Sequence, residues 1–144
     1  MRRLVSLRWL MLSLLWGGLS RMKIAAHIAS SNSADEYFTD ERCHILELSN
    51  SPDDPDVSIA RARVEPGVTT KRHRVAGTTE RYVVLAGKGR VFIDGLDEQA
   101  VTEGDVVVIP AGVIQSICND GDQDLIFLCI CNPRFEWGNY EALE

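Results

Sequence analysis

The sequence is organised around residues 67–87, GVTTKRHRVAGTTERYVVLAG. This stretch begins at a Pro-Gly turn, carries His73 and Glu80, and ends at the Gly-Lys-Gly turn of residues 87–89. Residues 81–86 are rich in β-branched side chains and include a tyrosine. This composition predicts a short buried strand that begins next to the glutamate.

A second stretch, residues 104–119 (GDVVVIPAGVIQSICN), follows the first. Together the two stretches resemble the paired motifs of the cupin superfamily, G-x5-HxH-x3,4-E-x6-G and G-x5-PxG-x2-H-x3-N. The matching positions are Gly67, His73, Glu80, Gly87, Gly104, Pro110, Gly112 and Asn119. Val75 and Gln115 stand where the family has its two other histidines. With the flanking strand pattern, the resemblance extends over residues 56–132.

The resemblance implies an all-β fold, the double-stranded β-helix or jelly-roll barrel, with a single cupin domain. The strand pattern agrees, because short β signals recur from residue 57 onward without an intervening helix. We expect strands at residues 43–48, 57–65, 69–74, 80–86, 90–94, 99–102, 105–110, 113–119 and 124–132. Tight turns are expected at residues 87–89 and 119–121.

The chain divides into four parts around this barrel. Residues 1–21 carry four arginines and no acidic residue. They suggest a signal peptide, a recorded start that precedes a native start at Met22, or a lipid-facing or packing helix. Residues 22–55 form an N-terminal arm with a first strand, residues 56–132 the cupin barrel, and residues 133–144 an aromatic tail. We expect a cytoplasmic protein, or an exported one if residues 1–20 are a signal peptide.

Composition limits the partners. The formal net charge is −6 and no basic stripe is present, which argues against a nucleic-acid partner. The apolar run near the N-terminus is short and interrupted by Arg8, so no membrane partner is expected. The tail contains Phe135, Trp137 and Tyr140, which are expected to pack on the barrel or on a second subunit, and we expect a homodimer.

The four cysteines show neither a zinc-finger spacing nor a Cys-x-x-Cys pair. Cys129 and Cys131 share one face of a predicted strand at about 7 Å, a separation that does not favour a disulfide. Buried reduced thiols are therefore expected, and this favours the cytosol.

The resemblance places His73, Glu80 and Gln115 at metal-ligand positions, whereas Val75 offers no donor atom. An inward-facing Glu80 is costly unless it is paired or ligated. Two accounts remain open: a divalent metal (Zn, Mn, Fe, Ni or Cu), with a further donor from Cys129 or Cys131, or a buried glutamate with a protein partner and no metal.

The interior is expected to be an apolar pocket with a few polar groups, which is typical of a small-molecule site. Its expected lining is Thr69, Val75, Tyr82 and Asn119. Two functions follow. One is a metal-dependent enzyme of the isomerase or dioxygenase kind. The other is a non-catalytic, metal-free module that binds a small sugar or carboxylate.

Overall fold

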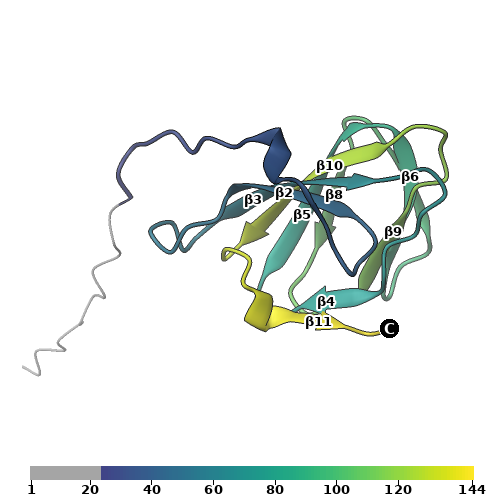
Figure 1. Ribbon diagram of the computed structural model, residues 1–144. Coiled ribbons are helices and arrows are strands. Elements are labelled where there is room, and N and C mark those ends of the chain that lie inside the picture. Colours follow the sequence, from purple (N-terminus) through teal and green to yellow (C-terminus); the bar gives the residue numbers. More distant parts are fainter. Residues whose placement is uncertain (1–23) are drawn as a thin grey trace, which may run out of the picture.

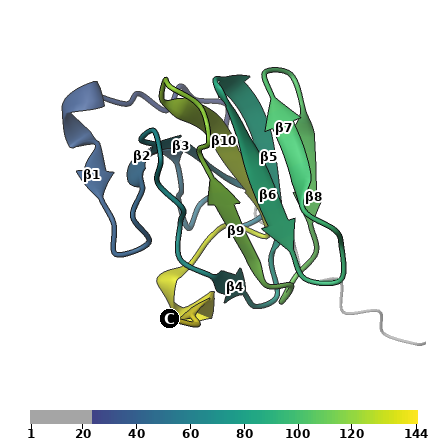
Figure 2. The same cartoon turned by 90° about the vertical axis from the view of Figure 1, so that its right-hand side faces the viewer.

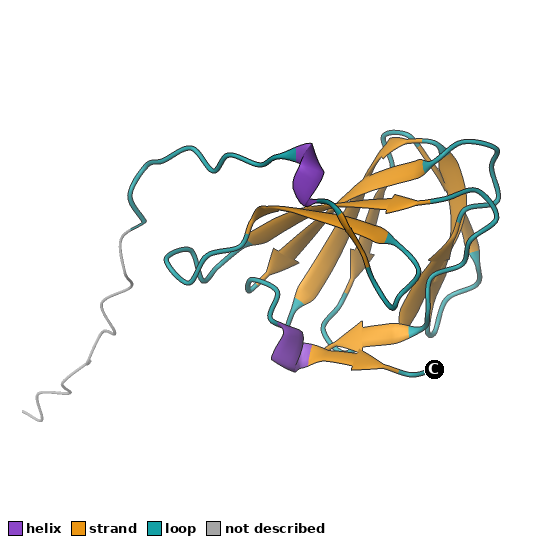
Figure 3. Ribbon diagram, in the orientation of Figure 1, coloured by secondary structure: helices purple, strands orange, loops and turns teal. Residues whose placement is uncertain are grey.

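The computed structural model describes residues 24–144, and it is built almost entirely of strands (Figures 1 and 3). The alternatives for residues 1–21 lie outside the described residues. The strands are β1 (Tyr37–Phe38), β2 (His44–Ser49), β3 (Ser58–Val64), β4 (His73–Val75), β5 (Thr79–Ala86), β6 (Lys88–Ile93), β7 (Gln99–Thr102), β8 (Val106–Ile109), β9 (Gln115–Cys118), β10 (Leu125–Asn132) and β11 (Tyr140–Ala142). Two short 3-10 helices, η1 (Ser33–Asp35) and η2 (Trp137–Asn139), complete the described elements.

The strands form two antiparallel sheets that face each other (Figure 2). One sheet has the order β1-β2-β3-β10-β5-β8 and the other β11-β4-β9-β6-β7. This arrangement confirms the predicted all-β double-stranded β-helix. Within residues 24–144 no strand of one sheet forms a ladder with a strand of the other, so the two sheets do not close into a barrel.

Strand β3 shows how the alternating sequence sets the inner and outer faces. Ala62 and Val64 are buried between the sheets, as the alternation predicts. Arg61 and Arg63 point outward and share Glu36, with N–O distances of 3.2 and 2.7 Å. The two outward arginines are thus paired with an acid of the N-terminal arm.

The core lies between the two sheets and comes from alternate positions of their central strands. Val64, Ile109, Ile117 and Leu125 are each at most 1% exposed. Both sheets contribute their inward-facing side chains to this core. On β4 and β5 some of the inward-facing residues are polar, and the apolar core ends there.

One sequence-based expectation needs correction. The strand expected at residues 69–74 is confined to His73–Val75, since the preceding residues bond singly to other segments: Thr69 bridges Cys118, and the Lys71 N–H donates to the Glu41 carbonyl. The expected turn near Gly87 is a sharp bend at that glycine (φ +81°). It carries the chain from β5 in one sheet to β6 in the other.

The aromatic tail packs on the domain, as expected. After β10 it forms η2 and then β11, which pairs antiparallel with β4 through Tyr140↔Val75 and Ala142↔His73. Figure 2 shows this segment lying beside β4. The pairing brings the tail aromatics next to the strand that carries His73. No helix in residues 24–144 is long and apolar enough to cross a membrane.

Candidate functional site

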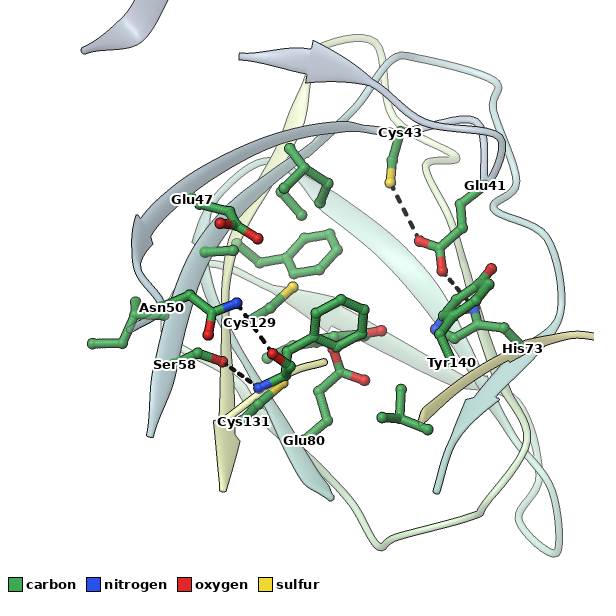
Figure 4. Close-up of a pocket in the computed structure, with 18 of the residues that line it drawn as sticks. Glu41, Cys43, Glu47, Asn50, Ser58, His73, Glu80, Cys129, Cys131 and Tyr140 are labelled. Atoms are coloured by element: carbon green, nitrogen blue, oxygen red, sulfur yellow. Dashed lines mark hydrogen bonds and ion pairs between the residues drawn. The ribbon is translucent and has the colours of Figure 1, made fainter. Parts of the chain in front are cut away.

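A cavity of about 80 Å³ lies between the sheets and beneath the tail (Figure 4). We call it the chamber. Its walls come from β2, β3, β4, β5 and β10, from the loop that precedes β2, and from the tail. Most of its surface is apolar, and Val75, Tyr82 and Phe127 are among the buried residues that line it. His73 and Glu80 supply buried polar groups.

His73, the first residue of β4, is 5% exposed and held in one orientation. Its Nδ1 lies 3.0 Å from the Lys71 carbonyl oxygen and 3.3 Å from Glu41 Oε1. Because a carbonyl oxygen only accepts, Nδ1 carries the proton and Nε2 is left without a hydrogen bond among the described residues. The Tyr140 ring stacks on the imidazole, with centroids 5.2 Å apart.

Glu80, near the start of β5, is 7% exposed and belongs to a buried chain of hydrogen bonds. The Gln115 Nε2 donates to Glu80 Oε2 (2.5 Å), and the Tyr82 hydroxyl donates to Gln115 Oε1 (2.7 Å). Burial raises the pKa of Glu80, while the Gln115 hydrogen bond and the His73 charge oppose that rise. Burial also raises the pKa of Tyr82 well above its ordinary value, so its hydroxyl remains a donor.

Glu41 and Tyr140 belong to the site although the motifs do not include them. Glu41 lies in the loop between β1 and β2, and it approaches both His73 and the thiol of Cys43. Burial and the neighbouring Glu41 raise the pKa of the Tyr140 hydroxyl. The aromatic composition of the tail indicated that Tyr140 packs on the domain, but nothing in the sequence marks Glu41.

The structure places the predicted pocket residues in different surroundings. Val75 and Tyr82 line the chamber. Thr69 does not, because it is exposed on the outer side and the adjacent Thr70 faces the chamber instead. Asn119 is fully buried outside the chamber, where Nδ2 donates to the carbonyls of Val64 and Gln123. It holds neighbouring segments of backbone together.

Three of the four cysteines line the chamber: Cys43, Cys129 and Cys131. All four are free, in agreement with the expectation of reduced thiols. Burial raises the pKa of Cys43 and of Cys131 to about 12, and that of Cys129 well above its ordinary value. The thiols are therefore neutral at ordinary pH and are poor metal ligands.

The donor atoms present do not fit a resident transition metal in this arrangement. Within residues 24–144, no three His, Cys, Asp or Glu side chains are grouped to hold a metal ion. Gln115, the third predicted ligand, has its oxygen occupied by Tyr82 and its nitrogen directed at Glu80. Of the three predicted ligands, only His73 Nε2 and one oxygen of Glu80 are free of hydrogen bonds to the described residues, whereas metal sites ordinarily use three or more protein donors.

Comparisons with known proteins agree with this fold. A family model described as the cupin domain matches residues 60–131. An oxalate-binding protein from Thermotoga maritima is 37% identical over 71 residues, which cover 49% of this chain and 58% of that protein. An uncharacterized protein from Methanocaldococcus jannaschii is 32% identical over 87 residues, covering 60% of this chain and 69% of that protein. The chain thus spans less than two thirds of the first relative.

Two solved structures illustrate the likeness in fold. Streptomyces Pac13, described as a nucleoside dehydratase, superposes with a TM-score of 0.66 at 14% identity, covering 80% of this chain and 90% of Pac13. A predicted oxalate decarboxylase from Thermotoga maritima superposes with a TM-score of 0.63 at 23% identity, covering 72% and 98%. The family match and the two-sheet architecture together show that this chain belongs to the cupin family.

Proposed function

We propose that this protein binds a small polar molecule in the chamber without a resident metal. Glu80 carries this proposal. Its carboxyl group is buried, and within the described residues it accepts a single hydrogen bond, from Gln115 to Oε2. The other oxygen, Oε1, has no protein partner there. Because Glu80 lines the chamber, this oxygen is available to accept a hydrogen bond from a molecule bound there.

The remaining polar groups give such a molecule a fixed orientation. His73 presents Nε2, while the Lys71 carbonyl and Glu41 hold the other side of the ring. Gln115 donates a hydrogen bond to Glu80, and Tyr82 donates one to Gln115. Because these polar groups already bond to one another, they are unavailable to the ligand. The ligand thus meets the imidazole and the Glu80 carboxyl group on a mostly apolar wall, to which Glu41 and Glu47 add further acidic groups. A few polar groups on an apolar wall are the usual composition of a small-molecule pocket.

The volume limits the size of what the chamber encloses. One water needs about 10–15 Å³ of such space, so 80 Å³ holds roughly five to eight waters. A molecule of a few heavy atoms fits entirely, and a larger one would leave part of itself outside. The Thermotoga maritima relative is named for oxalate, which is also a small molecule, and the match covers 58% of that protein.

A divalent metal is the second candidate, and the orientation of His73 favours it. Histidines that bind metals usually donate their other nitrogen to a carbonyl or carboxylate, as Nδ1 does here to Lys71 or Glu41. Metal binding would require Gln115 to turn its oxygen away from Tyr82 and toward the chamber. Because that movement breaks two buried hydrogen bonds, we place the metal second.

Metal analysis and thermal shift measurements on the purified chain test these candidates. We expect well below one equivalent of metal, and no rise in melting temperature with added Zn²⁺ or Mn²⁺. A panel of small sugars, acids, alcohols and amines should contain members that raise the melting temperature in the wild type but less in Glu80→Gln. Glu103→Gln, at an exposed position, serves as the matched control. Stoichiometric metal that disappears in His73→Ala would support the second candidate instead.

A further inference from the structure

We propose that the chamber binds a small organic cation, such as the ammonium head group of an amine or a quaternary ammonium compound. This inference rests on the proposed function of the chamber as a ligand site and specifies the class of ligand. Its evidence is the charge of the lining, the arrangement of the tail aromatics and the free oxygen of Glu80.

The charged groups of the lining are acidic. Glu41, Glu47 and Glu80 line the chamber, and no lysine or arginine is present among the described residues of its wall. Glu80 is the most deeply buried of the three, and Glu47 is exposed. An anion in this space would meet like charges, with no lysine or arginine of the described lining to pair with it. A cation would gain from the same groups, because Coulomb interactions are stronger inside a protein than in water.

The tail supplies aromatic rings set at steep angles to one another. The rings of Phe135 and Trp137 meet at 82° with centroids 5.1 Å apart, and those of Trp137 and Tyr140 at 69° with centroids 5.6 Å apart. All three line the chamber. In such edge-to-face pairs a ring covers only part of its neighbour's face. Tyr140 also stacks on His73, whereas Trp137 is 57% exposed and keeps part of its ring surface accessible. Ring faces attract cations, and aromatic cages of this kind bind quaternary ammonium groups.

The aromatic group is anchored at both ends. The Phe135 N–H donates to Ser58 Oγ (2.8 Å), and Asn50 Nδ2 donates to the Phe135 carbonyl oxygen (3.1 Å). Tyr140 is held by the stacked ring of His73. Trp137, between them, is 57% exposed, so part of its indole is open to an entering molecule. Figure 4 shows the contacts of the 50–58 segment and of Glu41 around the same space. Such anchoring lowers the conformational cost of binding.

The free oxygen of Glu80 gives the cation a counter-charge inside the chamber. Glu80 has no arginine or lysine partner among the described residues, and Gln115 donates its only hydrogen bond there. An ammonium group would pair with this carboxylate while its carbon substituents meet the ring faces. The volume of about 80 Å³ suits a head group of four or five heavy atoms, with any longer chain leaving past Trp137.

Isothermal titration of the wild type with three molecules of nearly the same shape tests the inference. Choline carries a quaternary nitrogen, 3,3-dimethyl-1-butanol replaces it with carbon, and 3,3-dimethylbutyrate is an anion of similar size. We expect choline to bind at least about tenfold more tightly than the neutral alcohol, and the acid to bind most weakly. Equal or tighter binding of the alcohol or the acid would overturn this inference and leave the proposed function standing.

Variants of Trp137 show whether the ring faces carry the preference. Trp137→Ala should lower choline affinity about tenfold, and Trp137→Phe should keep most of it, while binding of the neutral alcohol changes little in both. Phe92→Ala removes a partly exposed ring from β6, outside the chamber lining, and should have no effect. An unchanged choline affinity in Trp137→Ala would overturn the inference. If no molecule of this set or of the wider panel binds, the proposed function itself fails.

Discussion

Replacing Asn119 by alanine removes three hydrogen bonds made by a fully buried side chain. Nδ2 donates to the carbonyls of Val64 and Gln123, both at 2.8 Å, and Oδ1 accepts from the Gly121 N–H at 2.9 Å. A hydrogen bond contributes about 0.5–1.5 kcal/mol net, so we expect a loss of about 2–4 kcal/mol in the free energy of unfolding. This corresponds to a fall of about 6–15 °C in Tm for a domain of this size.

Urea denaturation followed by circular dichroism measures this loss. Asn132→Ala is the matched control, because Asn132 is exposed and its side chain donates one hydrogen bond, to the Asp56 carbonyl. We expect the control to lose about 1 kcal/mol or less. A loss below about 0.5 kcal/mol in Asn119→Ala would refute the structural role given to this residue. If a fully folded Asn119→Ala variant bound ligand more weakly, this would support the sequence-based prediction that Asn119 belongs to the binding site.

Three further predictions concern buried polar groups and assembly. Tyr82→Phe leaves the Gln115 amide oxygen without its donor and should cost about 1–3 kcal/mol in urea denaturation; an unchanged midpoint would contradict this. Because burial raises the folded-state pKa of Glu80 above its ordinary 4.5, wild-type stability should fall as pH rises from 4.5 through that raised pKa. Glu80→Gln should lack this fall, and parallel stability–pH curves would be evidence against it. We also predict a homodimer, in which exposed Val106 and Val108 of edge strand β8 supply apolar contact. Val108→Lys should then shift the sedimentation mass to that of a monomer, and a monomeric wild type at micromolar concentration would contradict the prediction.

Much of the fold could be predicted because the signals are local. The alternation in residues 57–65 sets the inner face of β3, where Ala62 and Val64 are buried. The turn at Gly87 is visible in the sequence, but its role is not. A turn motif does not say whether the strands beside it pair, and here they lie in different sheets.

The site was predictable only where it depends on motif positions. His73 and Glu80, which the family resemblance places at site positions, line one chamber. Thr69 was assigned to the chamber in place of Thr70, because a one-residue shift in phase reverses the face of an extended segment. The contact of Glu41 with His73 joins a loop to a strand 32 residues later, and no local pattern encodes such a contact.

The hydrogen-bonded chain from Tyr82 through Gln115 to Glu80 makes these positions epistatic. Gln115→His would bring back the family's ligand type at this position, but the shorter, rigid imidazole is not expected to keep both the hydrogen bond from Tyr82 and the one to Glu80. The reverse order meets another obstacle, since Val75→His places an imidazole in an apolar position. Each single substitution should therefore be less stable than either the present sequence or the double variant with metal bound. A stepwise change from a metal-free to a metal-binding chamber would thus pass through a single variant of lower stability. A protein near its stability threshold does not readily tolerate such an intermediate.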